Sequence, residues 1–334
     1  MAAERVPPRL LSGLLALAVL LLLVGSAAAG RVTLPLLAAM GEIAAGQSTP
    51  GSIILLELRL PRALLGGLVG ASLGLAGAAM QGLLRNPLAE PGVVGVSGLA
   101  ALGAVVAFYT GLSARFAYAL PLGGIAGAFA AVALLYALAG RRGGLLSLVL
   151  AGMALNSLAG ALTALALNLS PNPYASFEIV FWLMGSLADR SLFMVALAAP
   201  PMLLGWLLLA RAGPALDALS LGEDTARSLG FDLGRVRLRI IMATALAVGA
   251  AVAVAGVIGF VGLVVPHLLR PLVGHRPGRL LLPSALGGAL LVLAADIAIR
   301  LLATGPELKL GVLTALLGAP FFLWLVVRLR GEEG

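Results

Sequence analysis

Cysteine, lysine, histidine and acidic residues are scarce in this sequence of 334 residues. The absence of Cys excludes disulfides and thiolate metal or redox sites, and the presence of only two His argues against an enzyme site built on a His/Asp/Glu cluster. Charged residues make up 11% of the chain, against roughly 25% in soluble domains, which excludes a soluble globular protein. The formal net charge of +8 rests on residues too scattered to follow nucleic-acid phosphates.

Apolar residues dominate instead, at 61% of the chain with a mean hydropathy of +1.09. A hydrocarbon core about 30 Å thick needs roughly 20 apolar residues in a helix. Glycines and Pro266 divide the run 240–269 into a full helix and a shorter one, and the cluster 170–173 ends a helix and begins a loop. We therefore predict an all-α polytopic membrane protein of about ten transmembrane helices, with nine or eleven as alternatives. The apolar runs lie at 10–30, 63–84, 91–114, 116–140, 143–177, 191–210, 240–269, 280–299 and 310–327.

The basic residues predict the orientation of these spans. Ten spans place both termini on one side, and if that side is cytoplasmic, fifteen of the 22 Lys and Arg lie inside and seven outside, as the positive-inside rule requires. Residues 1–30 resemble a signal peptide, but their apolar run exceeds the usual length of about 7–15 residues, so we interpret them as an uncleaved first helix. The outer seven are Arg31, Arg59, Arg62, Arg115, Arg190, Arg300 and Lys309, and the inner fifteen are Arg5, Arg9, Arg85, Arg141, Arg142, Arg211, Arg227, Arg235, Arg237, Arg239, Arg270, Arg276, Arg279, Arg328 and Arg330.

Small residues recur at helical spacing in two of the spans. Gly66, Gly70 and Gly74 fall on one face of the second span, and Gly123 and Gly127 repeat the pattern in the fourth. Such rows let helix backbones approach closely where lipid provides no hydrophobic drive. We expect close helix packing along both rows.

The longest polar stretch, 211–239, is not a span. Pro214 can begin one short helix that Gly222 ends, and Gly230 can end a second helix that begins at Glu223. The two pieces carry an apolar face that no lipid covers, flanked by acidic residues, which predicts a docking surface for another protein. The alternative is an amphipathic helix on the inner leaflet, which the acidic residues disfavour because that leaflet is anionic. The apolar face comprises Leu216, Leu219, Leu221, Ala226 and Leu229.

This segment and four further motifs resemble the FecCD (BtuC-like) permeases of ABC importers, over nearly the whole chain. The chain departs from the usual pattern of that family at Leu99, where a Gly is typical, and at Lys309, where a Pro is typical. The motifs are ALSLGEDTARSLGFD at 218–232, LRLPR at 58–62, Gly77 and Gln81 followed by RNPLAEPGVVGVS at 85–97, GFVGLVVPHLLR at 259–270 and LGAPFFLWLV at 317–326.

The resemblance implies a type II ABC importer fold in a single permease domain, 1–334, with a cytoplasmic coupling segment at about 211–237. It also implies a homodimer in the bacterial inner membrane that works with two cytoplasmic ATPase subunits and a periplasmic binding protein. No GxxxxGK[ST] phosphate loop is present, so ATP and Mg are expected on the ATPase and no cofactor, metal or catalytic site on this chain. The residues implied in ATPase coupling are Leu219, Leu221, Gly222, Glu223, Asp224, Ala226, Arg227, Leu229 and Gly230.

Three outer arginines match family positions that meet acidic residues of the binding protein. Arg59 and Arg62 precede the second span and Arg300 follows the ninth. Guanidinium groups form geometrically fixed pairs with carboxylates, which suits docking; the alternative is snorkelling of helix-end arginines at the interface. Asp296 lies one turn before Arg300, which favours an ion pair over a proton relay.

The fifth helix carries a polar stripe. In the resembled family this helix lines the central cavity, so the stripe is a candidate pathway lining; hydrogen bonding between helices is the alternative. The two histidines, His267 and His275, fall on the inner side by this topology, too deep to serve as entry ligands for haem iron. The stripe comprises Asn156, Ser157, Thr163 and Asn168.

We therefore predict the permease subunit of an ATP-driven importer for an iron chelate, either haem or a ferric siderophore. Vitamin B12 (cobalamin) is the alternative substrate, because its permeases share the same motifs. An ion-coupled secondary transporter would need acidic residues buried at the midplane of the membrane, and the spans carry almost none.

Overall fold

The computed structural model describes residues 7–30, 32–116, 118–140, 144–170, 172–302 and 307–332. Over these residues the chain is all helical, as predicted, and contains no strand. Of the basic residues assigned to the two sides, Arg5, Arg31, Arg141 and Arg142 lie outside the described residues. The elements are α1 (Pro8–Ala28), α2 (Leu36–Ala44), α3 (Pro50–Ile53), η1 (Ile54–Arg59), α4 (Leu60–Leu84), η2 (Pro91–Val94), α5 (Val96–Tyr109), α6 (Leu112–Arg115), α7 (Ala119–Ala139), α8 (Leu145–Asn168), α9 (Pro173–Leu183), α10 (Leu192–Ala210), α11 (Gly213–Ser220), α12 (Glu223–Ser228), α13 (Leu233–Ala255), α14 (Val261–Leu269), η3 (Pro271–Val273), α15 (Pro277–Leu302) and α16 (Leu310–Glu332).

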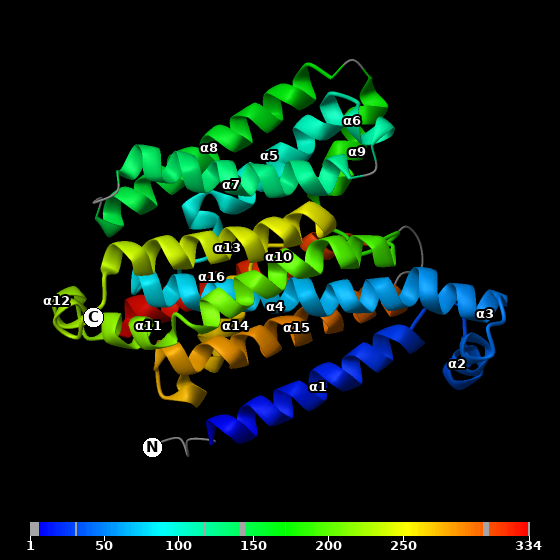
Figure 1. The fold of residues 1–334 in the computed structure, drawn as a ribbon, viewed down its shortest axis with the longest axis horizontal. Helices are drawn as coiled ribbons and strands as arrows, with labels where there is room; N and C mark the ends of the chain where they lie inside the picture. Colours follow the sequence, from blue (N-terminus) through cyan, green and yellow to red (C-terminus); the bar gives the residue numbers. More distant parts are fainter. Residues whose placement is uncertain are drawn as a thin grey trace.

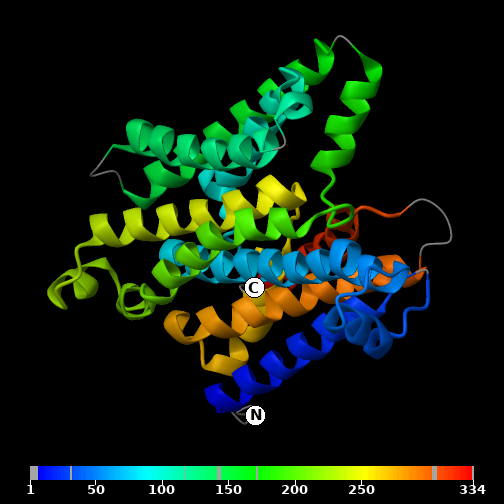
Figure 2. The same cartoon turned by 45° about the vertical axis from the view of Figure 1, so that its right-hand side comes forward.

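The long helices run side by side along the long axis of the molecule (Figure 1). α4 lies in the middle, with α14 and α15 on one side and α10 and α13 on the other. α1 lies beyond α15, and α5, α7 and α8 form a further group beyond α13 (Figure 1 and Figure 2). Burial follows this order: 83% of the most apolar window of the continuous helix 50–84 and 78% of that of α13 are buried, against 11% for α1. The two central helices therefore form the core.

Glycines bring the central helices into backbone contact. A Cβ atom built on Gly74 of α4 would lie 2.0 Å from the carbonyl oxygen of Ser284 on α15, and Gly70 meets the backbone of the same helix. A Cβ atom on Gly127 of α7 would lie 2.0 Å from the carbonyl oxygen of Leu99 on α5. The predicted close packing is confirmed for both rows. The departure at Leu99 leaves this packing intact because the facing helix supplies the small residue.

The run 240–269 divides into α13 and the nine-residue α14, as predicted. Pro266 inside α14 has no N–H, so the carbonyl of Gly262, one turn earlier, lacks its usual helical donor. The side-chain amide of Gln81 on α4 takes this place and donates to the carbonyl oxygens of Gly262 and Leu263, each at 3.3 Å. The buried side chain of Gln81 therefore supplies the hydrogen-bond donor that Pro266 lacks.

The number of spans stays a prediction. By length and composition, seven helices among the described residues can cross a membrane, and α5 and α16 contain shorter apolar stretches. α5 has 14 residues, which at 1.5 Å per residue is about 21 Å, short of a full crossing. The start of α1 and the end of α16 lie towards the same end of the molecule (Figure 1). That this end is cytoplasmic also stays a prediction.

The segment after α8 differs in part from the prediction. α8 ends at Asn168, just before the Ser/Pro/Asn cluster, as expected. The predicted loop is present but short, since residues 169, 170 and 172 lie outside both helices and α9 begins at Pro173. Proline is well tolerated in the first turn of a helix, and the side chain of Asn172 caps this turn by accepting a hydrogen bond from the N–H of Tyr174 at 2.9 Å.

Candidate functional site

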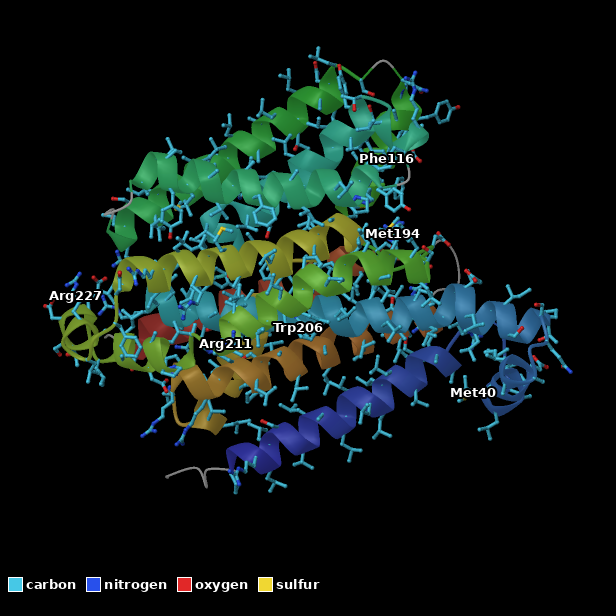
Figure 3. All side chains as sticks on the ribbon, viewed as in Figure 1. Met40, Phe116, Met194, Trp206, Arg211 and Arg227 are labelled. Atoms are coloured by element: carbon cyan, nitrogen blue, oxygen red, sulfur yellow. The ribbon has the colours of Figure 1, made fainter. Side chains whose placement is uncertain are left out.

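The predicted coupling residues and the predicted docking arginines lie at two opposite ends of the helix bundle. One end carries α11 and α12, residues 213–230, which we call the hairpin. The other carries five charged side chains that we call the arginine cluster. Figure 3 shows Arg211 and Arg227 at the hairpin end and Met40 of α2 at the opposite end. The arginine cluster comprises Arg59, Arg62, Asp296, Arg300 and Glu307.

The hairpin forms as the sequence predicts. Pro214 lies in the first turn of α11, and Gly222, with φ of 113°, separates α11 from α12. Gly230, with φ of 89°, follows α12. Side-chain-bearing residues rarely adopt these φ values, so glycine is needed at both turns. Asp217 fixes the hairpin to the bundle, because its carboxylate accepts the N–H of Gly278 at 2.7 Å in the first turn of α15.

The apolar face of the hairpin is divided between the core and the surface. Leu221 is 68% exposed and Leu229 is 60% exposed, so both can contact a partner. Leu216, Leu219 and Ala226 are buried, and the prediction that they lie on an exposed face is wrong. The reason is that α11 packs against α4 and α15 and α12 against α13, so the inner half of each short helix belongs to the core.

Charged side chains accompany the exposed leucines. Arg227 pairs with Glu223 at 3.1 Å and with Asp224 at 2.8 Å, and Arg237 reaches Glu223 at 2.7 Å. Exposed ion pairs contribute little to stability, because water screens them and ordering long side chains costs entropy. A partner can therefore replace the pairs of Arg227, whose side chain is 56% exposed, at small cost.

The arginine cluster is built around Asp296. This carboxylate, 1% exposed, lies 2.8 Å from Nη2 of Arg62 and 3.0 Å from Nη2 of Arg300. Arg62 also pairs with Glu307. The predicted ion pair between Asp296 and Arg300, one helical turn apart, is confirmed. Arg62 joins it from α4, a connection between distant segments that sequence spacing does not reveal.

The same arginines bind the end of α1. Arg59, in the π-helical turn before α4, donates to the carbonyl of Ala28 at 2.6 Å, and Arg300 donates to that of Ala29 at 3.0 Å. The last carbonyls of a helix lack helical donors and favour positive charge. A Cβ atom on Gly30 would lie 2.8 Å from Arg59 Nη2, so a larger residue at this position would require the guanidinium group to shift. Residues 27–29, near the end of the segment that resembles a signal peptide, thus accept hydrogen bonds from two arginines.

The cluster lines a cavity of about 270 Å³. Only 6% of Arg59 and 13% and 8% of the Arg62 and Arg300 side chains are exposed, and each guanidinium already has acceptors within this chain. The docking role of the three arginines stays a prediction. Glu307, whose side chain is 34% exposed, is the acidic member that lies nearer the surface.

The polar stripe of α8 faces outward for most of its length. Asn156, Ser157 and Asn168 are exposed and Thr163 is half-buried, so their pathway role stays a prediction. Asn156 also lines a cavity of about 190 Å³ together with Glu90, from the connection between α4 and η2. Burial raises the pKa of Glu90 above its ordinary value. The sequence analysis missed Glu90, which belongs to a motif between spans.

The remaining chemistry-bearing side chains do not converge. Among the described residues, no group of three His, Cys, Asp or Glu side chains is placed to hold a metal ion. His267 lies against the ring of Phe321, with centroids 5.7 Å apart. Lys309 places its Nζ 5.5 Å from the ring centre of Phe181, a cation–π contact made by the residue that replaces the usual proline.

Apolar helices of spanning length, close glycine packing and a polar helical hairpin at one end define a multi-pass, all-helical membrane protein. Comparison with known sequences then places it. The chain belongs to the FecCD transport family, whose model matches residues 16–328.

Individual relatives agree with this family. The chain is 48% identical to the vitamin B12 import system permease protein BtuC of Vibrio cholerae serotype O1, over 81% of this chain and 82% of that protein. It is 41% identical to the hemin transport system permease protein HmuU of Yersinia pestis, over 98% of both chains. A solved structure described as an inward-facing conformation of a metal-chelate type ABC transporter matches with a TM-score of 0.84 and 34% identity, over 96% of this chain and 99% of that one.

Proposed function

We propose that this chain is the permease subunit of an ATP-driven ABC importer in the bacterial inner membrane. It carries an iron chelate, either haem or a ferric siderophore, from a periplasmic binding protein into the cytoplasm. The observation that carries this proposal is the hairpin, in a chain that belongs to a transport family. Its exposed Leu221 and Leu229 stand on two short helices that are otherwise anchored in the core.

A permease without a P-loop (Walker A motif) needs a surface on which a separate ATPase subunit acts. Leu221 and Leu229 supply apolar anchors, and the ion pairs of Arg227 supply a polar rim, the usual composition of a protein interface. We infer two ATPase subunits, one for each permease of a homodimer. A homodimer is also the arrangement in which the exposed face of α8 becomes the lining of a central pathway.

The helix α15 offers a route between the two ends. Its first turn is bonded to the hairpin through Asp217 and Gly278, and its last turns carry Asp296 and Arg300 of the arginine cluster. Arg300 follows Gly278 by 22 positions, which corresponds to about 33 Å at 1.5 Å per residue. A movement of the hairpin therefore reaches the arginine cluster through a single helix.

The substrate proposal rests on a choice between two kinds of relative. The haem permease matches this chain over nearly its full length, which favours an iron chelate. Cobalamin is the second candidate, because the vitamin B12 permease has the higher identity over the part that it matches. A binding assay of the cognate periplasmic protein with haem, ferric siderophores and cyanocobalamin decides between them. Tight binding of cobalamin alone would overturn the proposed substrate.

Transport itself is tested by reconstitution. The permease is co-purified with its ATPase subunit, placed in liposomes with the binding protein outside, and assayed for uptake of the bound substrate. We expect uptake that requires ATP and stops with vanadate. Uptake that persists without the ATPase and follows an ion gradient would contradict the proposal and support a secondary transporter.

Docking at the arginine cluster has a separate test. Reversing the charge of the buried arginines would disturb the fold. The substitution Glu307→Gln is a more specific test, because it releases Arg62 from one of its two carboxylates. We expect the binding protein to stimulate the ATPase at lower concentration with this variant, while basal ATPase activity is unchanged. The control is Glu57→Gln, an exposed acid at the same end. Equal stimulation curves for all three proteins would overturn the docking assignment.

A further inference from the structure

A cavity of about 180 Å³ lies at the hairpin end, where α4, α11 and α14 finish and α15 begins. Arg85, Arg270 and His275 line this cavity together with the polar residues Gln81 and Ser220. We call it the basic cavity. None of the described residues that line it is acidic. It therefore concentrates positive charge where the described lining offers no balancing carboxylate.

Arg270 is held in the basic cavity by a neutral side chain. Its Nη2 donates to Oε1 of Gln81 at 2.5 Å, and Gln81 is fixed in turn because its amide is bonded to the carbonyls of α14. The Nε of Arg270 is buried and has no hydrogen-bond partner among the described residues. A buried charged donor without an acceptor is costly, and such a group in a native protein calls for an ion or an ordered water.

Arg85 and His275 border the same cavity with unusual backbone conformations. Their φ values are 50° and 61°, two of the four positive values found for non-glycine residues in the described chain. Residues with side chains rarely adopt this region, and strained positions cluster at ligand clamps. The side chain of Arg85 is exposed and makes no ion pair within the described residues.

The acidic side chain of α11 does not fill this role. Asp217 lies outside the lining of the basic cavity, and its carboxylate is bonded to the N–H of Gly278. The situation differs from the arginine cluster, where Asp296 and Glu307 face the guanidinium groups directly. The described lining of the basic cavity thus contains two arginines and no carboxylate to pair with them.

We propose that the basic cavity binds a phosphate group. Both Arg270 and Arg85 line the cavity, so phosphate oxygens can accept from their guanidinium groups, and guanidinium–phosphate contacts are strong and geometrically specific. The volume is about six times the roughly 30 Å³ that one water occupies in the liquid, enough for a tetrahedral phosphate. Basic pockets between helices at a membrane surface bind anionic lipid head groups, and free phosphate presents the same oxygens. The proposal concerns this chain alone and does not depend on its role in transport.

The test uses the purified full-length chain, freed of lipid and titrated under native mass spectrometry. One arm adds phosphatidylglycerol, with a galactosyl diacylglycerol that lacks phosphate as its control. The other arm adds inorganic phosphate at matched ionic strength and follows the thermal midpoint. Binding in the lipid arm alone identifies a head group as the source, and binding in the phosphate arm alone identifies free phosphate. Binding in both arms shows that the cavity accepts either.

Substitutions locate the binding. Loss of one charge-assisted hydrogen bond corresponds to about tenfold weaker binding or more, which we expect for Arg85→Gln and Arg270→Gln. The control is Arg211→Gln, which removes an exposed arginine at the same end and is expected to change affinity less than about twofold. If Arg270→Gln does not fold, Arg85→Gln decides, because Arg85 has no ion pair to lose. The proposal is overturned if the wild-type chain binds neither ligand, or if Arg85→Gln and Arg211→Gln weaken binding equally.

Discussion

At the arginine cluster, three guanidinium groups are enclosed by acceptors of the same chain, whereas at the hairpin end Arg227 lies on the surface and Arg85 and Arg270 line a cavity whose described lining holds no acid. Asp296 receives two of the enclosed arginines from α4 and α15, and the carbonyls at the end of α1 receive the third. At the hairpin end, the exposed Arg227 pairs with the half-buried Glu223 and the fully exposed Asp224, and Arg270 is held only by an uncharged amide.

This difference separates residues that hold the fold from residues that can meet a partner. A buried ion pair is costly to break because the charge left behind is isolated from water. An exposed pair is exchanged at little cost, since water and the partner replace it. We therefore expect substitutions at the arginine cluster to act first on folding, and substitutions at the hairpin to act first on association.

The largest effect is expected for Asp296→Ala. The change leaves Arg62 and Arg300 buried without their central acceptor, and breaking a buried pair in this way costs about 3–5 kcal/mol. The free energy of unfolding is measured by titration with SDS in mixed micelles, followed by tryptophan fluorescence. Asp224→Ala is the matched control, because it removes a fully exposed acid from its pair with Arg227. Equal losses for the two variants would remove the distinction between the two ends.

The next effect concerns association rather than folding. Leu221→Asp and Leu229→Asp place a charge on the exposed anchors of the hairpin, and interface anchors of this kind carry about 2 kcal/mol or more, roughly thirtyfold in affinity. We expect the ATPase subunit to be lost on co-purification while the unfolding free energy is unchanged. Leu37→Asp, at an exposed leucine of α2 at the other end, should retain the ATPase. Retention of the ATPase by both hairpin variants would show that it binds elsewhere.

A third effect, of about 1–3 kcal/mol, is expected for Gln81→Leu. This change leaves the carbonyl of Gly262 without a donor, because Pro266 cannot supply one, and removes the acceptor that holds Arg270. The loss is measured by the same SDS titration, with the exposed Gln47→Leu as control. Replacing Pro266 by Ala in the same chain should recover part of the loss, since the helical N–H returns. No recovery would show that Gln81 acts through Arg270 alone.

The sequence predicts well those features that depend on local residue types. The boundary between α13 and α14, the two glycine turns of the hairpin and the Asp296–Arg300 pair all follow from residues within a few positions of one another. The backbone contact of α4 with α15 was also predictable in part, because a row of glycines indicates that another helix packs closely against it. The row does not indicate which helix this is.

Features that depend on tertiary packing could not be read in the same way. Whether a leucine of the hairpin is covered depends on α4, α13 and α15, so Leu216 and Leu221 look alike in sequence and differ in burial. The partners of Arg62 lie on α15 and beyond it, more than two hundred residues away in the chain. The basic cavity likewise joins four segments, none of which indicates a site by itself.

The smallest effect on stability is expected for Arg227→Gln, and it sharpens the contrast most directly. Arg227 makes two ion pairs, as many as the enclosed Arg62, so a count of pairs alone would predict similar losses. Its side chain is 56% exposed, however, and its loss releases Asp224 into water while Glu223 keeps its pair with Arg237. We expect no measurable change in the SDS unfolding curve but weaker capture of the ATPase, measured side by side with Arg62→Gln. A loss of stability comparable to that of Arg62→Gln would mean that the hairpin pairs hold the fold as the arginine cluster does.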